Sequence, residues 1–167
     1  RIETPVQLSI LIPSNRTGLL ACSRIAQACS WASPGIEVIV RDNSGDAQKR
    51  GIISQFQGEF AKIVIAEPCE SLENFSEILR LAQGDYVYFL ADDDYCFDRG
   101  IAAVPGILSQ HGKDPNVIGV VGAFAIESSQ GSSITSYPDA DADDVVARVA
   151  GYLKFEGPNM LTNSPLR

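Results

Sequence analysis

Short apolar runs alternate along this chain with segments whose apolar residues recur at helical spacing. The runs are too short for helices and are bounded by turn residues, so we expect them to be strands buried within a sheet. They cover Leu8 to Ile12, where Pro13 stops the run, Ile36 to Val40, Ile63 to Ala66 and Tyr86 to Leu90. A fifth, glycine-containing run extends from Val117 to Ala125.

The segments between these runs are expected to be helices. The clearest covers Leu19 to Cys29, and a weaker one lies around Ile52 to Phe56. Ser71 is a plausible N-cap for a third helix that Gly84 is placed to end. Asp98 can cap a fourth, which Pro105 and Gly106 should break or kink. Later apolar residues from Val145 to Leu153 indicate one more helix.

Four β-α units in succession predict an α/β fold, a three-layer α/β/α sandwich with a mostly parallel sheet. With 167 residues, the chain is expected to form a single domain, 1–167. Its 13 basic and 21 acidic residues give a net charge of −8, which argues against a nucleic-acid partner. An anionic ligand would therefore need a metal or a local arginine to offset this charge.

Cysteine and histidine usage argues against a Cys/His zinc site. The chain has four cysteines with no C-x-x-C pair and one histidine, His111, in a polar context at the expected end of a helix. Free thiols favour a reducing, cytoplasmic location, although the sequence alone leaves a disulfide open. We find no signal peptide and no apolar run long enough to span a bilayer, and expect any association with the cytoplasmic face of a membrane to come from segments outside this chain.

The polar residues that follow the strands carry the candidate chemistry. In open α/β sheets, ligands bind outside the carboxyl ends of the strands. Those ends are Pro13 to Arg16, Asp42 to Ser44, Glu67 to Pro68, and Asp92 to Asp94. Three adjacent carboxylates after a buried strand suit a metal ion, because they repel one another unless a cation or solvent relieves them. A solvated acidic turn is the simpler alternative.

Other functional classes lack their motifs. The chain has no G-x-G-x-x-G for a dinucleotide, no P-loop for a nucleoside triphosphatase and no G-x-S-x-G for a serine hydrolase. Asp139, Asp141 and Asp143 resemble a calcium loop, but the expected glycine is Asp144, so a solvated helix start is preferred. A receiver domain would carry its acidic pocket on other strands and a lysine that is absent near Ala125.

Three segments resemble the nucleotide-binding half of a family-2 glycosyltransferase of the GT-A fold. They read SILIPSNRTGLL, IEVIVRDNSGD and SLENFSEILRLAQGDYVYFLADDD, and the likeness covers residues 6 to 110. The LADDD form is similar to the abequosyltransferase-like members of bacterial surface-polysaccharide pathways. The resemblance implies a donor-binding half at 1–110 and the start of an acceptor-side half at 111–167.

The resemblance also implies roles for individual residues. The first loop would line the nucleotide base and reach the diphosphate, and Asp42 would accept a hydrogen bond from the base, uracil in most members. Asp92 would lie near the ribose or sugar, and Asp93, with Asp94, would hold Mn²⁺ or Mg²⁺. Ala91 departs from the family's pattern, which often has aspartate there, and this bears on the ribose contact more than on the metal. The nucleotide-binding residues carried over are Pro13, Ser14, Asn15, Arg16, Asp42, Asn43, Ser44 and Asp92.

The implied reaction is metal-dependent, inverting transfer of a sugar from a nucleotide-diphosphate donor, UDP-linked or else dTDP-, CDP- or GDP-linked, to a saccharide or lipid-linked acceptor. The metal would neutralise the leaving diphosphate, and a carboxylate base would deprotonate the acceptor. We expect this base beyond Arg167, because Glu127, Asp139 and Glu156 lie in no recognisable motif. The alternative is a module that binds the nucleotide sugar without transferring it.

Overall fold

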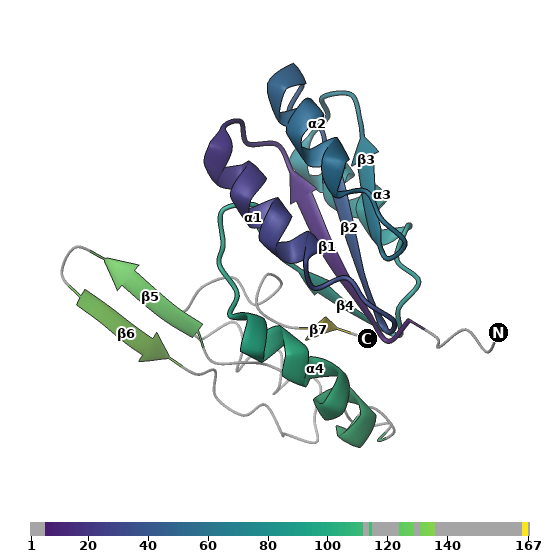
Figure 1. Cartoon of the computed structure of the whole chain (residues 1–167), viewed down its shortest axis with the longest axis vertical. Helices are drawn as coiled ribbons and strands as arrows, with labels where there is room; N and C mark the ends of the chain where they lie inside the picture. Colours follow the sequence, from purple (N-terminus) through teal and green to yellow (C-terminus); the bar gives the residue numbers. More distant parts are fainter. Residues whose placement is uncertain (1–5, 112–113, 115–123, 129–130, 136–164, 167) are drawn as a thin grey trace.

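The computed structural model describes residues 6–111, 114, 124–128, 131–135 and 165–166. Within them, the central sheet has the strand order β3-β2-β1-β4-β7 (Figure 1). The first four strands are parallel and β7 is antiparallel to β4. The strands are β1 (Leu8–Ser14), β2 (Ile36–Asp42), β3 (Ala61–Ile65), β4 (Tyr86–Phe89) and β7 (Pro165–Leu166). The predicted mostly parallel sheet is confirmed.

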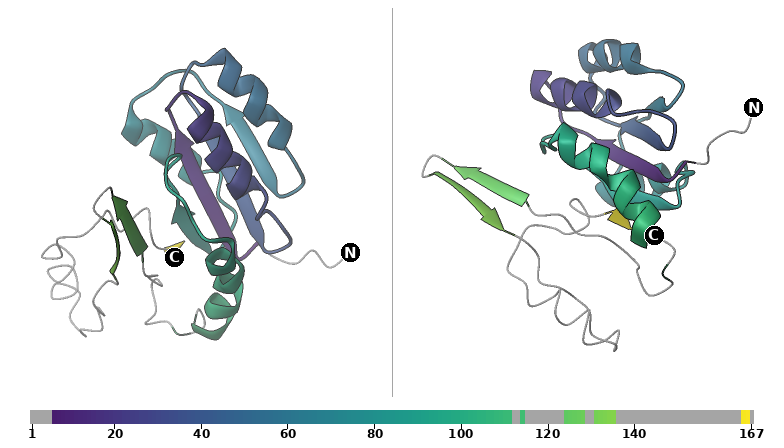
Figure 2. Two further views of the ribbon diagram at one scale, coloured as in Figure 1. Left: turned by 60° about the vertical axis from the view of Figure 1, so that its left-hand side comes forward. Right: turned by 60° about the horizontal axis from the view of Figure 1, so that its bottom comes forward.

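Helices cover both faces of this sheet, so the three-layer α/β/α sandwich is also confirmed (Figures 1 and 2). The alternating side chains of β1 explain the layering, because Ile10 and Ile12 face one helical layer and Leu11 faces the other. On the first face lie α1, α2 and α4, and on the second lies α3. The helices are α1 (Leu19–Cys29), α2 (Ala47–Ile53) followed by the 3₁₀ turn η1 (Ser54–Phe56), α3 (Ser71–Leu79) and α4 (Asp98–His111).

Several predicted boundaries differ from the structure, and three of them have a clear local reason. β1 continues through Pro13 to Ser14, and Pro13 is tolerated because β4 pairs with β1 only as far as Leu11. Glu70, with no side-chain cap bond, precedes α3, so Ser71 is its first residue rather than its N-cap. The third is α4, which continues unbroken through Pro105, with Ile101 and Leu108 on either side of the proline both buried in the core.

The later predictions fall largely outside the described residues. Only the end of the fifth apolar run is described, and it forms β5 (Phe124–Ser128), which pairs antiparallel with β6 (Gly131–Thr135) in a separate two-stranded sheet. Residues 139–144 and the expected helix at 145–153 lie outside the described part. His111 is the last residue of α4, as predicted. All four cysteines are free, and none of the described helices is long and apolar enough to cross a membrane.

Gly84 does not end α3, which stops five residues earlier at Leu79. Its backbone N–H donates to Ser9 Oγ at 2.8 Å, and an added Cβ would lie 2.7 Å from the Ser9 nitrogen and 2.9 Å from the Leu8 carbonyl carbon. We therefore expect Gly84→Ala to lower the free energy of unfolding by about 1–3 kcal/mol, the usual cost of overpacking. Urea denaturation measures this change.

The matched control is Gly51→Ala in α2, where an added Cβ meets nothing within 4 Å. Alanine is the better helix former, so this variant should be neutral or more stable by up to about 1 kcal/mol. Equal effects of the two substitutions would contradict the close approach of Gly84 to β1.

Candidate nucleotide-sugar site

The site lies where the strand order reverses. The chain runs from β1 outward to β2 and β3, and then returns to place β4 on the other side of β1. Ligands of open α/β sheets bind at such a switch point, at the carboxyl ends of the strands. Here the tips of β1 and β4 are adjacent, since Leu8 to Leu11 pair in register with Tyr86 to Phe89. The predicted first loop and acidic cluster are thus brought together.

Lys49 is the common partner of the strand tips, and sequence reasoning missed it. Asp46 caps α2 by accepting hydrogen bonds from the backbone N–H groups of Gln48 and Lys49, at 2.9 and 3.1 Å. This cap fixes the first helical turn beneath the tips of the strands. The lysine side chain is fully buried there. A signal was present, because Lys49 stands one helical turn before the buried Ile53 and so shares its face.

The ammonium group of Lys49 joins two strands at their ends. Its Nζ lies 2.7 Å from Asp42 Oδ1, and it donates at 2.6 Å both to Ser14 Oγ and to the backbone carbonyl of Arg16. Asp92 Oδ2 is 3.9 Å away. A charge buried without partners would cost far more than it does in water, so these contacts are what allow Lys49 and Asp42 to be buried.

Asp42 is fully enclosed in this arrangement. Its Oδ1 pairs with Lys49, and its Oδ2 accepts a hydrogen bond from Ser44 Oγ at 3.1 Å. The predicted contact with a nucleotide base would require the carboxylate to become accessible. It stays a prediction.

The three consecutive aspartates have different surroundings. Asp92 is buried and accepts hydrogen bonds from Ser14 Oγ and from the backbone N–H of Arg16. Asp93 is half-buried and faces Arg16, whose guanidinium nitrogen is 2.8 Å from its Oδ2. Asp94 is exposed. Partial desolvation of its carboxyl group by the surrounding turn, together with the charge of Asp93, raises its pKa, and Arg16 opposes this effect.

Two cavities flank the strand tips. One, of about 540 Å³, is lined by residues of the first loop, α1 and the acidic turn: Asn15, Arg16, Thr17, Leu20, Ala21 and Asp93. It brings together three of the predicted site residues.

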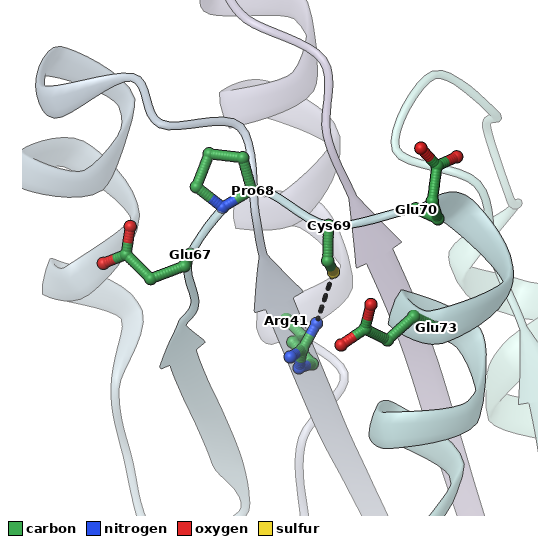
Figure 3. A pocket seen from close by; sticks show the side chains of 6 residues that line it. All are labelled: Arg41, Glu67, Pro68, Cys69, Glu70 and Glu73. Carbon is green, nitrogen blue, oxygen red and sulfur yellow. Dashed lines mark hydrogen bonds between the residues drawn. The ribbon is translucent and has the colours of Figure 1, made fainter.

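The other cavity, of about 550 Å³, lies beside β2, α3 and the segment before α3 (Figure 3). Arg41 donates to Cys69 Sγ at 3.5 Å and to Asn74 at 2.6 Å, and Asn43 donates to the Cys69 carbonyl at 2.9 Å. The remaining lining residues are Glu67, Pro68, Glu70 and Glu73. None of the ten predicted site residues lines this cavity, but buried Asn43 holds one edge of it.

Comparison with known proteins identifies the fold. S. aureus TarS 1-349 superposes with a TM-score of 0.53 at 16% identity, over 64% of this chain and 33% of that one. A mannosyltransferase, PcManGT from Pyrobaculum calidifontis in complex with GDP-Man and Mn²⁺, gives 0.53 and 16%, over 70% of this chain and 36% of that one. No protein-family model and no curated protein matches the sequence.

The class of fold follows from these superpositions. It is the GT-A-like, Rossmann-related fold of nucleotide-sugar transferases, as the sequence resemblance implied. At 16% identity the likeness shows the fold alone, and the chain spans about a third of the length of either neighbour.

Proposed function

We propose that this chain binds the donor of a metal-dependent, inverting glycosyltransferase, which moves a sugar from a nucleotide diphosphate to a saccharide or lipid-linked acceptor. One observation carries the proposal. At the switch point of a GT-A-like sheet, Arg16 and Asp93 face each other on the wall of a cavity. A cation held by Asp93 and a guanidinium beside it are the two groups that a diphosphate needs.

The charges of the site favour a divalent cation. Arg16 and Lys49 contribute two positive charges and Asp42, Asp92, Asp93 and Asp94 four negative ones, which leaves a net charge of −2. The described residues contain no cluster of three or more acidic, cysteine or histidine side chains arranged around a metal. Mg²⁺ and Mn²⁺ fit nonetheless, because one or two carboxylates suffice when phosphate oxygens and waters complete the shell. Asp93 and Asp94 are the residues that would hold the ion.

The other residues bind and orient the donor in this proposal. Asn15 and Arg16, both exposed on the first loop, are placed to reach the diphosphate. Asp42, Asn43 and Ser44 shape the turn expected to meet the base, with Pro13 and Ser14 beneath it. Asp92 is expected near the ribose or sugar, fixed by its contacts with β1. The bound cation would stabilise negative charge on the leaving diphosphate.

Acceptor chemistry is assigned to the second half of the domain. In this proposal residues 1–110 are the donor half and residues 111–167 belong to the acceptor side. Of the acidic residues considered earlier, Glu127 lies in β5, and Asp139 and Glu156 lie outside the described part. The sequence resemblance supports a role in bacterial surface-polysaccharide synthesis, in the cytoplasm or at the cytoplasmic face of the membrane.

Calorimetric titration of the chain with UDP tests the proposal, first with Mn²⁺ and then with EDTA. We expect binding with Mn²⁺ and its loss with EDTA. GDP, CDP and dTDP follow under the same conditions, because the base is the least supported part of the donor. Failure of all four to bind with Mn²⁺ would contradict the proposal.

A second candidate function is binding of the nucleotide sugar without transfer. The site residues that the structure brings together favour it. They belong to the tips of β1, β2 and β4 and to α2, and all of these elements lie in the proposed donor half. Turnover with a supplied acceptor separates the two functions. Hydrolysis of the donor alone is weaker support for transfer, because it requires no acceptor site.

A further inference from the structure

Arg16 differs from Lys49, the other cation of the site, in being exposed to solvent. Its Nε lies 3.2 Å from Asp92 Oδ1, and a terminal nitrogen lies 2.8 Å from Asp93 Oδ2. The side chain is nevertheless 60% exposed, against 0% for Lys49. Breaking the contacts of Lys49 would leave Asp42 buried without its counter-charge, whereas an exposed arginine can exchange its partner for water or another anion at little cost.

The two partners of Arg16 also differ. The Asp92 side chain is 5% exposed and is held by Ser14, and the backbone N–H of Arg16 itself donates to it. Asp93 is 34% exposed, and Arg16 is the residue that pairs with it among those described. Of the two ion pairs that Arg16 forms, the one with Asp93 is therefore the one that another ligand can more easily replace.

That same bond competes with a metal. A divalent cation on Asp93 would use carboxylate oxygens, one of which Arg16 already engages. Two positive groups so close together on one carboxylate repel each other unless further negative charge arrives. A diphosphate in the adjoining cavity brings that charge, and it is also a better partner for a guanidinium, which binds phosphate oxygens in a bidentate manner.

We infer that Arg16 is a partner-exchanging residue that couples binding of the metal to binding of the diphosphate. Without ligand it neutralises Asp93. When metal and nucleotide arrive together, Asp93 passes to the metal and the guanidinium of Arg16 turns to the diphosphate. The inference rests on the proposed function. It adds that the ion pair between Arg16 and Asp93 weakens metal binding in the free protein, so that a substitution of Arg16 should strengthen it.

The test measures Mn²⁺ affinity without nucleotide, by the electron paramagnetic resonance signal of free Mn²⁺. Arg16→Gln should raise this affinity about two- to fivefold, the range expected from losing one exposed ion pair. The same variant should bind UDP, or whichever of the four diphosphates the wild type prefers, more weakly in the presence of Mn²⁺. Opposite changes in the two affinities are the signature of exchange.

Two further variants separate partner exchange from a general effect of charge. Arg16→Lys keeps a positive charge, but an ammonium group lacks the fork that spans two carboxylates. Under exchange it should also raise the Mn²⁺ affinity. Arg80→Gln is the matched control, since Arg80 forms an exposed ion pair with Glu77 on α3, and it should change neither affinity.

The outcomes distinguish the inference from the function on which it rests. If wild-type binding of nucleotide requires Mn²⁺ but Arg16→Gln leaves the Mn²⁺ affinity unchanged or lowers it, exchange is wrong and the function stands. If Arg16→Lys matches the wild type while Arg16→Gln binds Mn²⁺ more tightly, only the local charge matters and exchange is again wrong. If the wild type binds no nucleoside diphosphate with Mn²⁺, both fail.

Discussion

Lys49→Met is expected to lower the free energy of unfolding by about 3–5 kcal/mol, the cost of removing one partner of a buried ion pair. The methionine side chain fills a similar volume but leaves the Asp42 carboxylate in the interior without its counter-charge. It also removes the donor to Ser14 Oγ and to the Arg16 carbonyl, at the start of the first loop. Chemical denaturation monitored by the fluorescence of Trp31 gives the change.

Two comparisons separate this effect from the loss of any lysine. Lys62→Met changes an exposed residue of β3 and should stay within about 0.5 kcal/mol of the wild type. In the double variant Asp42→Asn, Lys49→Met, both charges are gone, and part of the lost stability should return, because a buried pair can often be replaced by neutral groups. A single Lys49→Met variant as stable as Lys62→Met would show that the pair does not stabilise the fold.

Asp93→Ala is expected to abolish metal-dependent nucleotide binding while leaving the fold intact. The affinity for nucleoside diphosphate in the presence of Mn²⁺ should fall more than about 100-fold, since changes to residues that merely support a metal ligand typically cost 10–100-fold. Stability should change by less than about 1 kcal/mol, because the lost ion pair with Arg16 is largely exposed. Calorimetry and denaturation measure the two quantities on the same preparation.

Asp85→Ala is the matched control for this variant. Asp85 is exposed and immediately precedes β4, at the opposite end of the strand that leads to Asp93, so the change in net charge is identical but the site is untouched. It should bind nucleotide like the wild type. Unchanged affinity in Asp93→Ala would remove Asp93 from the metal site, and equal losses in the two variants would indicate an effect of net charge alone.

The sheet and the position of its site could be predicted because they follow from local patterns. Each apolar run ended close to a polar turn, and parallel strands necessarily bring such turns to one edge. The meeting of Arg16 with Asp93 therefore agrees with the expected grouping of first loop and acidic turn. The predicted end of β1 came two residues too early because of Pro13, which is tolerated where β4 no longer pairs with β1.

The pairing of charges could not be predicted in the same way. Asp42 would be expected from the sequence to be an exposed acidic strand end, but it is buried and paired with Lys49, seven residues later. The sequence does not distinguish the three consecutive aspartates after β4. In the structure, the Asp92 side chain is buried against Ser14, whereas that of Asp93 is partly exposed and pairs with Arg16. Such differences depend on side-chain partners from distant segments, which neither hydrophobic period nor turn chemistry encodes.

The order of the strands has a consequence for biosynthesis. Ser14 and Asp92 touch although 78 positions separate them, because β4 follows β2 and β3 in the chain but pairs with β1 on the side opposite β2. Contacts so distant along the chain are expected to close late, since the entropy of the intervening loop is lost before they contribute. Under the proposed function, a nascent chain that has not yet delivered Tyr86–Phe89 from the ribosome would lack the site for the diphosphate. If the proposed function holds, nucleotide sugars would stabilise only chains whose parallel sheet is complete and would not act on incomplete ones.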